Sequence, residues 1–402
     1  MKIGIIGGGA AGFFAAINIA EKIPGAQITI LEKSNKVLSK VKVSGGGRCN
    51  VTNGREKPAA LTPFYPRGGK KLYKSFQTFG TNEMRHWLEK RGIPTKTEED
   101  LRVFPASNTS QTIIDCFLRL SQKHSISVLR GFGVSKIEQA GESWQVHTNE
   151  EVLSFDQLIV ASGASEQTWR LLENLGLQTA TRVPSLFTFN IKDPRLKELQ
   201  GLSFPEATIK ITTTKLVESG PLLITHWGLS GPAVLKLSAW GAERLAEKQY
   251  TFEVIANLIN QPSDSFRAWL KQQQTAHGNR QVGNLQIEGC PNRYFQQLLD
   301  VAEIPSTRKL AELSKKDLNK ITEELTQAHF SVKGKSTFKE EFVTCGGVSL
   351  NEIDLTNMQA KRFPGLYLAG EVINIDALTG GFNFQACWTG GWLISEHLKT
   401  SA

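Results

Sequence analysis

The sequence predicts an α/β protein in which one domain is assembled from two separated parts of the chain, with further structure inserted between them. Three observations support this class. Residues 2–32 read as strand, glycine turn, helix and strand, residues 365–391 read as a strand running into a long helix, and strand patterns followed by helix patterns fill the interval. The 402 residues allow two or three domains, and 40% hydrophobic residues suffice for buried cores.

The N-terminal segment has the pattern of one βαβ unit. The apolar run KIGII stops at GGGAAG, the next residues repeat apolar side chains at helical spacing, and QITILE forms a second β-rich run. In such a unit Gly7 permits the tight turn, Gly9 lets the backbone approach a diphosphate, and Gly12 lets the helix pack closely. Because the N–H groups at the start of a helix attract anions, Ala10 and Ala11 are also expected at the diphosphate.

Glu32 ends the second strand, about twenty residues after Gly12. A carboxylate at this point can accept hydrogen bonds from both ribose hydroxyls, and it would repel a 2′-phosphate. Lys33 follows at the same edge and is included in the predicted site. The pattern predicts a bound dinucleotide but does not distinguish FAD from NAD.

A second glycine cluster, SGGGRCNVTNG, occupies residues 44–54. Successive backbone N–H groups in such a loop can surround an anion, and an arginine adds positive charge. The alternative is a flexible loop, although glycines followed directly by Arg-Cys-Asn favour a binding role. The residues expected to contact a cofactor here are Gly46, Gly47, Arg48, Cys49 and Asn50.

The C-terminal block has the order of elements that a flavin site needs. A strand ends in Gly370-Glu371, an acidic residue follows at Asp376, and a glycine pair opens a long helix from about Asn383. Either carboxylate can reach a ribityl chain, and N–H groups at the helix start can face the flavin N1/O2 edge. The predicted contacts in this block are Gly370, Glu371, Asp376, Gly381, Phe382, Asn383 and Phe384.

Taken together, these segments closely resemble the BaiN/YhiN-like family, also called aminoacetone-oxidase-type FAD-binding flavoproteins. The resemblance spans nearly the whole chain in the same order. It rests on GGGAAG at 7–12, SGGGRCNVTN at 44–53, RVFP at 102–105, THWGLSGP at 225–232, TCGGVSLNEI at 344–353 and GLYLAGEVINIDALTGGFNFQACWTGG at 365–391. It implies FAD as cofactor and a Rossmann-like FAD-binding domain, split in sequence, with an inserted β-rich domain and a small helical domain.

The resemblance also implies further cofactor neighbours. The segment ASGAS at 161–165 resembles an ATGG element near the cofactor, which implicates Ala161, Ser162 and Gly163, although Ser162 stands where a threonine is usual. The backbone at Val134 matches a position that contacts the adenine. A second departure is Asn374, which replaces the aspartate usual in the stretch after Gly-Glu and puts the role of that position in doubt.

The domain limits follow from these assignments. The FAD-binding domain is expected at 1–182 and 343–402, the β-rich domain at 183–258 and 328–342, and the helical domain at 259–327. The inserted strands are expected in LFTFNI, ATIKITTT and YTFEVIANL, and the helices in FRAWLKQQQ, RYFQQLLDVAE and TRKLAELSKKDLNKITEELTQ.

Three side chains are candidates for the proton donor or acceptor beside a flavin. His226 lies in a glycine-bounded loop where it could overhang the isoalloxazine ring, and Cys345 and Cys49 lie beside glycine turns. The alternative for each is a structural role, because a lone histidine is usually structural and a buried cysteine usually packs as an apolar side chain.

The composition limits the possible cellular location and binding partners of the protein. No run approaches the roughly 20 apolar residues of a membrane span, and five widely spaced cysteines support neither a disulfide framework nor a metal site. We therefore expect a cytoplasmic protein. A net charge of +9 favours an anionic partner such as ribosomal RNA, with basic clusters at 65–74, 308–316 and 332–339, or simply a solvated basic surface. The oligomeric state is not indicated.

These features predict an FAD-dependent oxidoreductase in which reduced flavin reduces an unsaturated bond. No second complete βαβ fingerprint is visible, so NAD(P)H is the expected reductant through transient docking over the flavin, and another reductant is the alternative. The preferred substrate is uridine in ribosomal RNA, giving dihydrouridine. The alternatives are an oxidase or reductase of a small amino-ketone or enone, and a flavin- or RNA-binding module without turnover.

Overall fold

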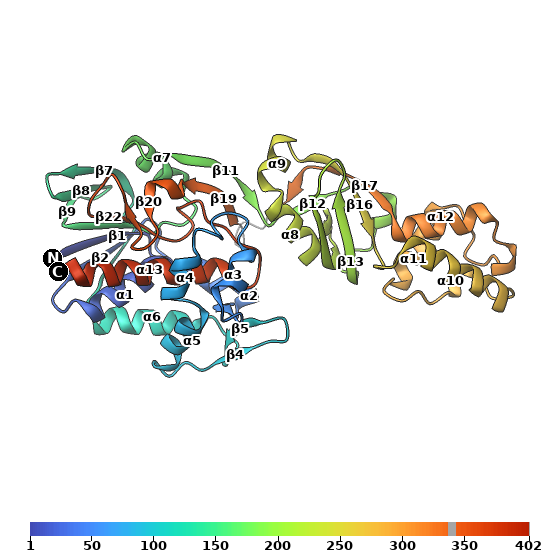
Figure 1. The fold of residues 1–402 in the computed structure, drawn as a ribbon, viewed down its shortest axis with the longest axis horizontal. Helices are drawn as coiled ribbons and strands as arrows, with labels where there is room; N and C mark the ends of the chain where they lie inside the picture. Colours follow the sequence, from blue (N-terminus) through green and yellow to red (C-terminus); the bar gives the residue numbers. More distant parts are fainter. Residues whose placement is uncertain (337–342, 402) are drawn as a thin grey trace. The chain divides into compact units, whose positions relative to one another are not determined.

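The computed structural model describes residues 1–336 and 343–401, and it confirms the predicted α/β class. The chain divides into two compact units (Figure 1): Met1–Val183 with Lys339–Ala402, and Pro184–Phe338. The first unit is therefore built from both ends of the chain, and the second unit is inserted between them. Residues 337–342, at the second junction, lie outside the described part, as do residues 337–339 of the third basic cluster.

The first unit is centred on a seven-stranded sheet whose middle is parallel. Strand β1 pairs in parallel with β10 on one side and β2 on the other, so that Ile5 lies beside Ile159 and Ile30. All three side chains are fully buried, as expected for a sheet covered on both faces. The order is β20 (Ile353–Asp354), β21 (Gln359–Ala360), β22 (Leu366–Leu368), β10 (Gln157–Val160), β1 (Lys2–Ile6), β2 (Gln27–Glu32) and β6 (Ser127–Arg130).

Two helices from opposite ends of the sequence pack against each other in this unit. Helix α1 (Ala10–Lys22) lies along α13 (Phe382–Ser401), with α6 (Gln111–Lys123) beside α1 (Figure 1). The ring of Phe14 in α1 lies 5.3 Å from that of Trp388 in α13 and 6.4 Å from that of Phe117 in α6. This aromatic contact fixes the C-terminal helix against the helix of the βαβ unit.

Smaller elements complete the first unit. In the part of the chain that the structure describes, they are two three-stranded sheets, a two-stranded ladder, five short α-helices and two 3-10 helices, Thr62–Phe64 and Leu350–Glu352. The sheets consist of β3 (Thr52–Asn53), β5 (Arg102–Pro105) and β4 (Thr95–Thr97), and of β7 (Val134–Ala140), β8 (Ser143–Thr148) and β9 (Val152–Phe155). The ladder joins β11 (Thr179–Ser185) to β19 (Val343–Val348), and the helices are α2 (Ser39–Gly47), α3 (Pro58–Leu61), α4 (Tyr73–Thr78), α5 (Thr81–Glu89) and α7 (Glu166–Asn174).

The second unit is a seven-stranded sheet with helices packed against the same core. Its order is β17 (Ala328–Lys333), β16 (Thr251–Asn257), β13 (Ser203–Ile211), β14 (Val217–Ile224), β15 (Gly228–Ser230), β12 (Thr188–Asn190) and β18 (Lys335–Ser336). The pairings are antiparallel, and inward residues alternate with outward ones. The helices are α8 (Pro232–Trp240), α9 (Ala242–Glu247), α10 (Ser263–Ala276), α11 (Asn292–Val301) and α12 (Lys315–Thr326).

The structure differs from the sequence expectation at two places in this unit. Residues 185–258 include helices α8 and α9 as well as strands; α8 begins at Pro232, a residue suited to the first helical position, directly after Gly231 at φ +94°. The expected helix from residue 307 begins only at Lys315, because Ser314 caps it by accepting the Asp317 N–H. Buried apolar residues of 259–327 belong to the same cluster as those of the sheet, and the limits of the small helical domain stay a prediction.

Among the described residues, no helix has the length and apolar character needed to cross a membrane.

Candidate cofactor site

The turn between β1 and α1 is fixed by two glycines that tolerate no side chain. Gly7 has φ +115°, and a Cβ on it would lie 2.4 Å from the Ala161 carbonyl oxygen at the end of β10. A Cβ on Gly12 would lie 2.1 Å from the Gly7 carbonyl oxygen. Gly12 is therefore packed closely, as predicted, and its nearest neighbour is the backbone of the glycine turn. Ala161 and the glycine turn are brought together from distant parts of the sequence.

Gly9 has a different environment from these two. It is the N-cap of α1 with φ −98°, and a Cβ placed on it would meet no atom within 4 Å. The first backbone bond into the helix is donated by Phe13 to the Gly9 carbonyl, so the N–H groups of Ala10, Ala11 and Gly12 precede it. Open space at a helix N-terminus whose first turn carries no acidic residue suits a diphosphate.

Glu32 is oriented by backbone donors at the end of β2. Its Oε2 accepts the Gly8 N–H and its Oε1 accepts the Ser34 N–H, both at 2.9 Å. A carboxylate offers about four acceptor positions, so lone pairs remain for the two ribose hydroxyls that the sequence predicts here. Lys33, which is exposed, follows this carboxylate in the chain. The arrangement suits the ribose of an adenosine.

The predicted adenine neighbour lies close to this carboxylate. The N–H of Phe132 donates to the Glu32 carbonyl at 3.0 Å, which brings the start of β7 to the end of β2. Val134 opens β7 and is 7% exposed. Its carbonyl accepts a hydrogen bond from Gln167 Nε2 at 2.9 Å. Contact between adenine and the Val134 backbone stays a prediction.

The three glycines of the second cluster lie at the C-terminal end of α2, where the backbone leaves the helical conformation. Gly45, Gly46 and Gly47 have φ values of +58°, +67° and +82°, which side chains rarely adopt. A Cβ on Gly45 would lie 3.0 Å from the ring of Phe104, whereas Gly46 and Gly47 face open space. The turn is therefore held on one side and accessible on the other.

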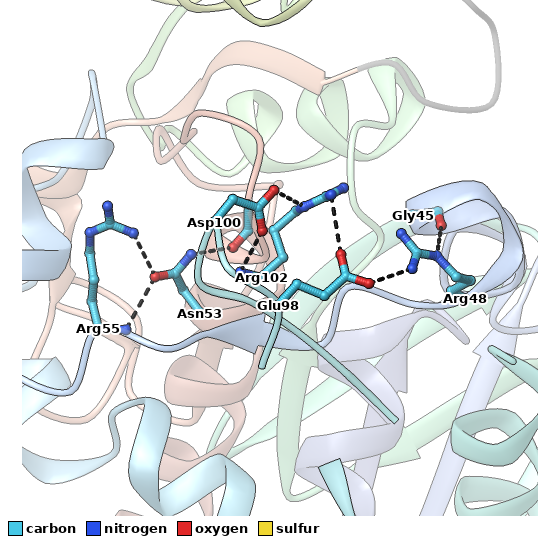
Figure 2. Close-up of polar contacts among 8 residues, drawn as sticks. Gly45, Arg48, Asn53, Arg55, Glu98, Asp100 and Arg102 are labelled. Carbon is cyan, nitrogen blue, oxygen red and sulfur yellow. Dashed lines mark hydrogen bonds and ion pairs between the residues drawn. The ribbon is translucent and has the colours of Figure 1, made fainter. Parts of the chain in front are cut away.

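Arg48 is held in a chain of charged groups beside this turn (Figure 2). Its Nε donates to the Gly45 carbonyl at 3.4 Å, its Nη1 lies 2.7 Å from Glu98, and its guanidinium lies 4.0 Å from the Phe104 ring centroid. Glu98 also pairs with Arg102 at 3.2 Å, and Arg102 with Asp100 at 2.6 Å. The positive charge expected at this loop is thus partly balanced within the protein.

The two residues after Arg48 are turned inward. Cys49 has φ +61° and no exposed surface, and burial raises the pKa of its thiol to about 12. The thiol therefore stays protonated at neutral pH, which disfavours a nucleophilic role. In the amide orientation that satisfies both of its polar groups, Asn50 donates to the Thr52 and Val103 carbonyls and accepts the Gly381 N–H at 2.9 Å.

The strand that follows this cluster is hydrogen-bonded to the start of α13. Thr52 Oγ1 donates to Gln385 at 2.6 Å, and Asn53 Nδ2 donates to the Gly380 carbonyl at 2.9 Å. A Cβ on Gly381, at φ +86°, would lie 2.3 Å from the Thr52 carbonyl oxygen. Both glycine clusters and the C-terminal helix therefore meet in one region of the first unit, as a split cofactor domain requires.

The start of α13 presents backbone donors on a braced loop. Gln385 donates the first helical bond to the Gly381 carbonyl, so the N–H groups of Phe382, Asn383 and Phe384 precede the helical ladder. The Asn383 side chain bonds both the N–H and the carbonyl of Ala377 at 3.0 Å, which braces the loop. The rings of Phe382 and Phe384 stack on Phe64 and Trp388 at 4.5 and 5.5 Å.

The segment around Glu371 joins three more of the predicted residues. Glu371 Oε2 pairs with Lys40 at 2.5 Å, and its Oε1 accepts the Thr344 N–H at 2.9 Å. A Cβ on Gly163 would lie 3.8 Å from this carboxylate, and one on Gly370, at φ +78°, would lie 3.2 Å from Ala11 Cβ in α1. Next to Gly163, the half-buried Ser162 has its Oγ 3.4 Å from the Gly163 carbonyl oxygen.

Asp376 forms a buried ion pair with Arg67. The aspartate side chain has no exposed surface and that of Arg67 is 12% exposed. Arg67 belongs to the basic run 65–74, so this cation is an internal partner of a carboxylate and not a surface charge. The ribityl contact expected of Asp376 stays a prediction, as does that of Glu371.

The side-chain oxygen of Asn374 is a hydrogen-bond acceptor to which no described residue donates. Its Oδ1 is buried and has no hydrogen-bond partner among them. A buried acceptor without a donor is unfavourable by about 1–3 kcal/mol. It lies between Glu371 and Asp376 in the loop predicted to hold the ribityl chain, and a hydroxyl group of that chain would supply the missing donor. Together with the open space at Gly9, this atom indicates that the site fits FAD.

Substitution of Asn374 by alanine tests this fit. We expect N374A to fold with unchanged or slightly higher stability, because it removes an unsatisfied buried acceptor. We expect its FAD dissociation constant to rise by about 5–10-fold, the loss of one hydrogen bond. Titration of the apoprotein with FAD, followed by flavin fluorescence, measures this. An unchanged dissociation constant would show that Oδ1 does not contact the cofactor.

The three candidate proton donors belong to two different units of the chain. Cys49 and Cys345 both lie in the first unit without exposed surface, in the turn after α2 and in β19. His226 is exposed in the turn between β14 and β15 of the second unit. Sequence reasoning missed Lys40 and Arg67 as the partners of the two predicted carboxylates, because nothing local in the sequence marks a pairing across hundreds of residues.

The fold and the site define the class of this protein. A βαβ unit with an open diphosphate position, joined to a C-terminal helix whose N-terminus suits a flavin, is the construction of an FAD-dependent oxidoreductase. Residues 1–397 match the family described as HI0933-like protein Rossmann domain, and the chain belongs to this family. The family is the flavoprotein family that the sequence motifs resemble, so the resemblance is confirmed.

Known proteins similar to this chain match it along almost its whole length. The ribosomal RNA dihydrouridine synthase of Escherichia coli K12 is 28% identical, covering 98% of this chain and 97% of that protein. The 3-dehydro-bile acid delta(4,6)-reductase of Clostridium scindens is 22% identical and covers 98% of each. The 3-ketosteroid-delta4-(5alpha)-dehydrogenase of Rhodococcus jostii RHA1 has the same fold, with a TM-score of 0.53, 12% identity and coverage of 98% and 97%.

Proposed function

We propose that this protein reduces uridine in ribosomal RNA to dihydrouridine, using FAD with NAD(P)H as electron donor, in the cytoplasm. The reaction adds two hydrogens across the C5=C6 bond of the base: uridine, NAD(P)H and one proton give dihydrouridine and NAD(P)⁺. The chemistry that FAD would supply when bound is hydride transfer between the nicotinamide and the pyrimidine. The single observation that carries the proposal is the 28% identity, end to end, with the ribosomal RNA dihydrouridine synthase of Escherichia coli.

The chemistry of a second relative supports the reaction type. The 3-dehydro-bile acid delta(4,6)-reductase acts, by its name, on carbon–carbon double bonds of a ketosteroid. The C5=C6 bond of uracil is likewise conjugated to a carbonyl. Two relatives with such different substrates therefore share reduction of an electron-poor double bond. Reduction of a small enone is accordingly the second candidate function for this chain.

The residues of this chain have defined tasks in the proposal. The open turn at Gly9 and the carboxylate of Glu32 would hold the adenosine diphosphate part of FAD, and the free N–H groups at the start of α13 would stabilise the negative charge that develops on a flavin during reduction. Addition to the double bond also needs a proton donor. Cys49 is a poor donor because its thiol pKa is about 12, whereas His226 and Cys345 stay candidates.

Anaerobic reduction of the FAD-loaded protein tests the proposed function. We expect NADH or NADPH to bleach the flavin absorbance, and an unmodified ribosomal RNA transcript to restore it with formation of one dihydrouridine per flavin reoxidised. Mass spectrometry of the digested transcript measures the product. A transcript made with dihydrouridine in place of uridine is the matched control, and it should leave the flavin reduced.

The other outcomes identify the alternatives. Reoxidation by 4-androstene-3,17-dione and not by RNA would replace the RNA assignment with a small-molecule reductase. Reoxidation by dioxygen alone would indicate an oxidase. A protein that takes up FAD but is not reduced by either nicotinamide would contradict the assigned electron donor.

A further inference from the structure

Trp227 is an exposed aromatic side chain at the tip of the turn between β14 and β15. It is 57% exposed, whereas Trp144 and Trp388 have no exposed surface. The neighbouring His226 is exposed as well. A single exposed apolar side chain is common on protein surfaces, so a binding role for this ring has to be argued from the residues around it.

The turn that carries this ring is rigid. The Thr225 N–H donates to the Gly228 carbonyl at 2.8 Å, and the Trp227 N–H donates to Thr225 Oγ1 at 3.3 Å. Gly228 has φ +141°, and a Cβ on it would lie 2.4 Å from the Phe189 carbonyl oxygen of β12. The backbone beneath the ring is therefore fixed against the sheet. A ring presented on a fixed backbone loses little conformational entropy on binding.

A segment with exposed lysines is hydrogen-bonded to both sides of the turn. Residues 191–202 begin where the Ile191 N–H donates to the Trp227 carbonyl at 2.8 Å and end where the Ile224 N–H donates to the Leu202 carbonyl at 2.9 Å. The segment carries two exposed lysines, Lys192 and Lys197.

A third cation reaches this segment from α11. Arg293, which is exposed, donates to the Glu198 carbonyl at 3.1 Å. Of the two acidic residues of the segment, Asp193 is paired with Arg195 at 2.7 Å, and Glu198 is exposed and lies 3.8 Å from Lys197. Exposed cations thus outnumber exposed carboxylates around the ring.

We infer that Trp227 stacks on a base of single-stranded RNA, while Lys192 and Lys197 contact the adjacent phosphates. An aromatic ring with flanking cations is the combination that binds single-stranded nucleic acid, because every base has a face for stacking and every nucleotide has a negative charge. A steroid or other neutral small molecule would use the ring but not the cations. The inference rests on the proposed function, since it names the surface that would hold the RNA substrate.

Binding of fluorescein-labelled oligouridine to the FAD-loaded full-length protein, measured by fluorescence anisotropy, tests this inference. We expect W227A to raise the dissociation constant about 5- to 100-fold, the range found when one stacked base is lost. W227F keeps a stacking ring and should stay within about threefold of the native value. W240A removes another exposed tryptophan of the same unit, 38% exposed at the end of α8, and should bind as the native protein does.

Two further measurements separate the explanations. An abasic oligonucleotide has phosphates without bases, so the native protein and W227A should bind it equally. Equal affinity of the two proteins for oligouridine overturns the inference, and so does a W227A protein that loses FAD or changes its flavin spectrum without RNA, because the ring would then belong to the cofactor site. If the native protein forms no dihydrouridine but W227A loses oligouridine affinity, the inference stands and the proposed reaction fails.

Discussion

Replacing Asp376 with alanine is expected to lower the free energy of unfolding of the first unit by about 3–5 kcal/mol. The carboxylate has no exposed surface, and its partner Arg67 is 12% exposed. Removal of the aspartate leaves the guanidinium, which cannot lose its proton at any ordinary pH, without its countercharge in a site that water hardly reaches. Urea denaturation of the apoprotein, followed by intrinsic fluorescence, measures the loss.

A matched pair of variants tests the cause of this loss. R170A removes the cation of the exposed pair between Arg170 and Glu166, whose side chains are 72% and 53% exposed, and should change stability by less than about 0.5 kcal/mol. Joint substitution of Arg67 by Met and Asp376 by Leu removes both buried charges and should recover most of the stability lost in D376A. A D376A protein as stable as R170A would contradict the assignment of a buried pair.

This ion pair shows which parts of the site the sequence does not reveal. Arg67 and Asp376 are 309 residues apart, and Lys40 and Glu371 are 331 residues apart. The sequence marked both carboxylates as candidate ribityl contacts, because an acid after a strand end has a local signature. It did not indicate Arg67 or Lys40 as their partners, because a pairing between residues so far apart in the sequence leaves no regular spacing that could be recognised.

Elements with local determinants were predicted more completely. The βαβ unit was predicted at 2–32, and the structure has β1, α1 and β2 within these limits, because apolar periodicity and glycine turns act over a few residues. Helix α8 was missed, because its apolar run PAVLKLSAW is short and lies among strand patterns. The inward position of Cys49 depends on the left-handed turn before it and on tertiary packing, which cannot be inferred from the residue types in this segment.

The hydrogen bonds between the two chain segments explain how a split domain forms a single site. Asn50, Thr52 and Asn53 bond to the residues that open α13, and Trp388 Nε1 donates to the Val51 carbonyl at 2.7 Å. These bonds lie inside the protein, where unpaired polar groups are costly, so they favour one register of the helix start. The second glycine cluster therefore positions α13, besides any contact it makes with a cofactor.

Substitution of Gly9 by alanine distinguishes a cofactor site from a merely structural turn. A methyl group at Gly9 meets no protein atom within 4 Å, and φ −98° is accessible to alanine, so the apoprotein should lose at most about 1 kcal/mol, the difference between glycine and alanine at a helix N-cap. If the FAD diphosphate occupies that space, the methyl group collides with it. We then expect the FAD dissociation constant to rise about 10- to 100-fold.

The comparison of G9A with G12A makes this prediction specific. A Cβ at Gly12 would lie 2.1 Å from the Gly7 carbonyl oxygen, so G12A should lower the stability of the apoprotein itself as well as FAD binding. G9A should lower FAD binding alone, as shown by thermal unfolding of both apoproteins and titration of each with FAD. If G9A binds FAD as tightly as the native protein, the diphosphate does not rest on the first turn of α1, and the assignment of the whole site to FAD loses its geometric basis.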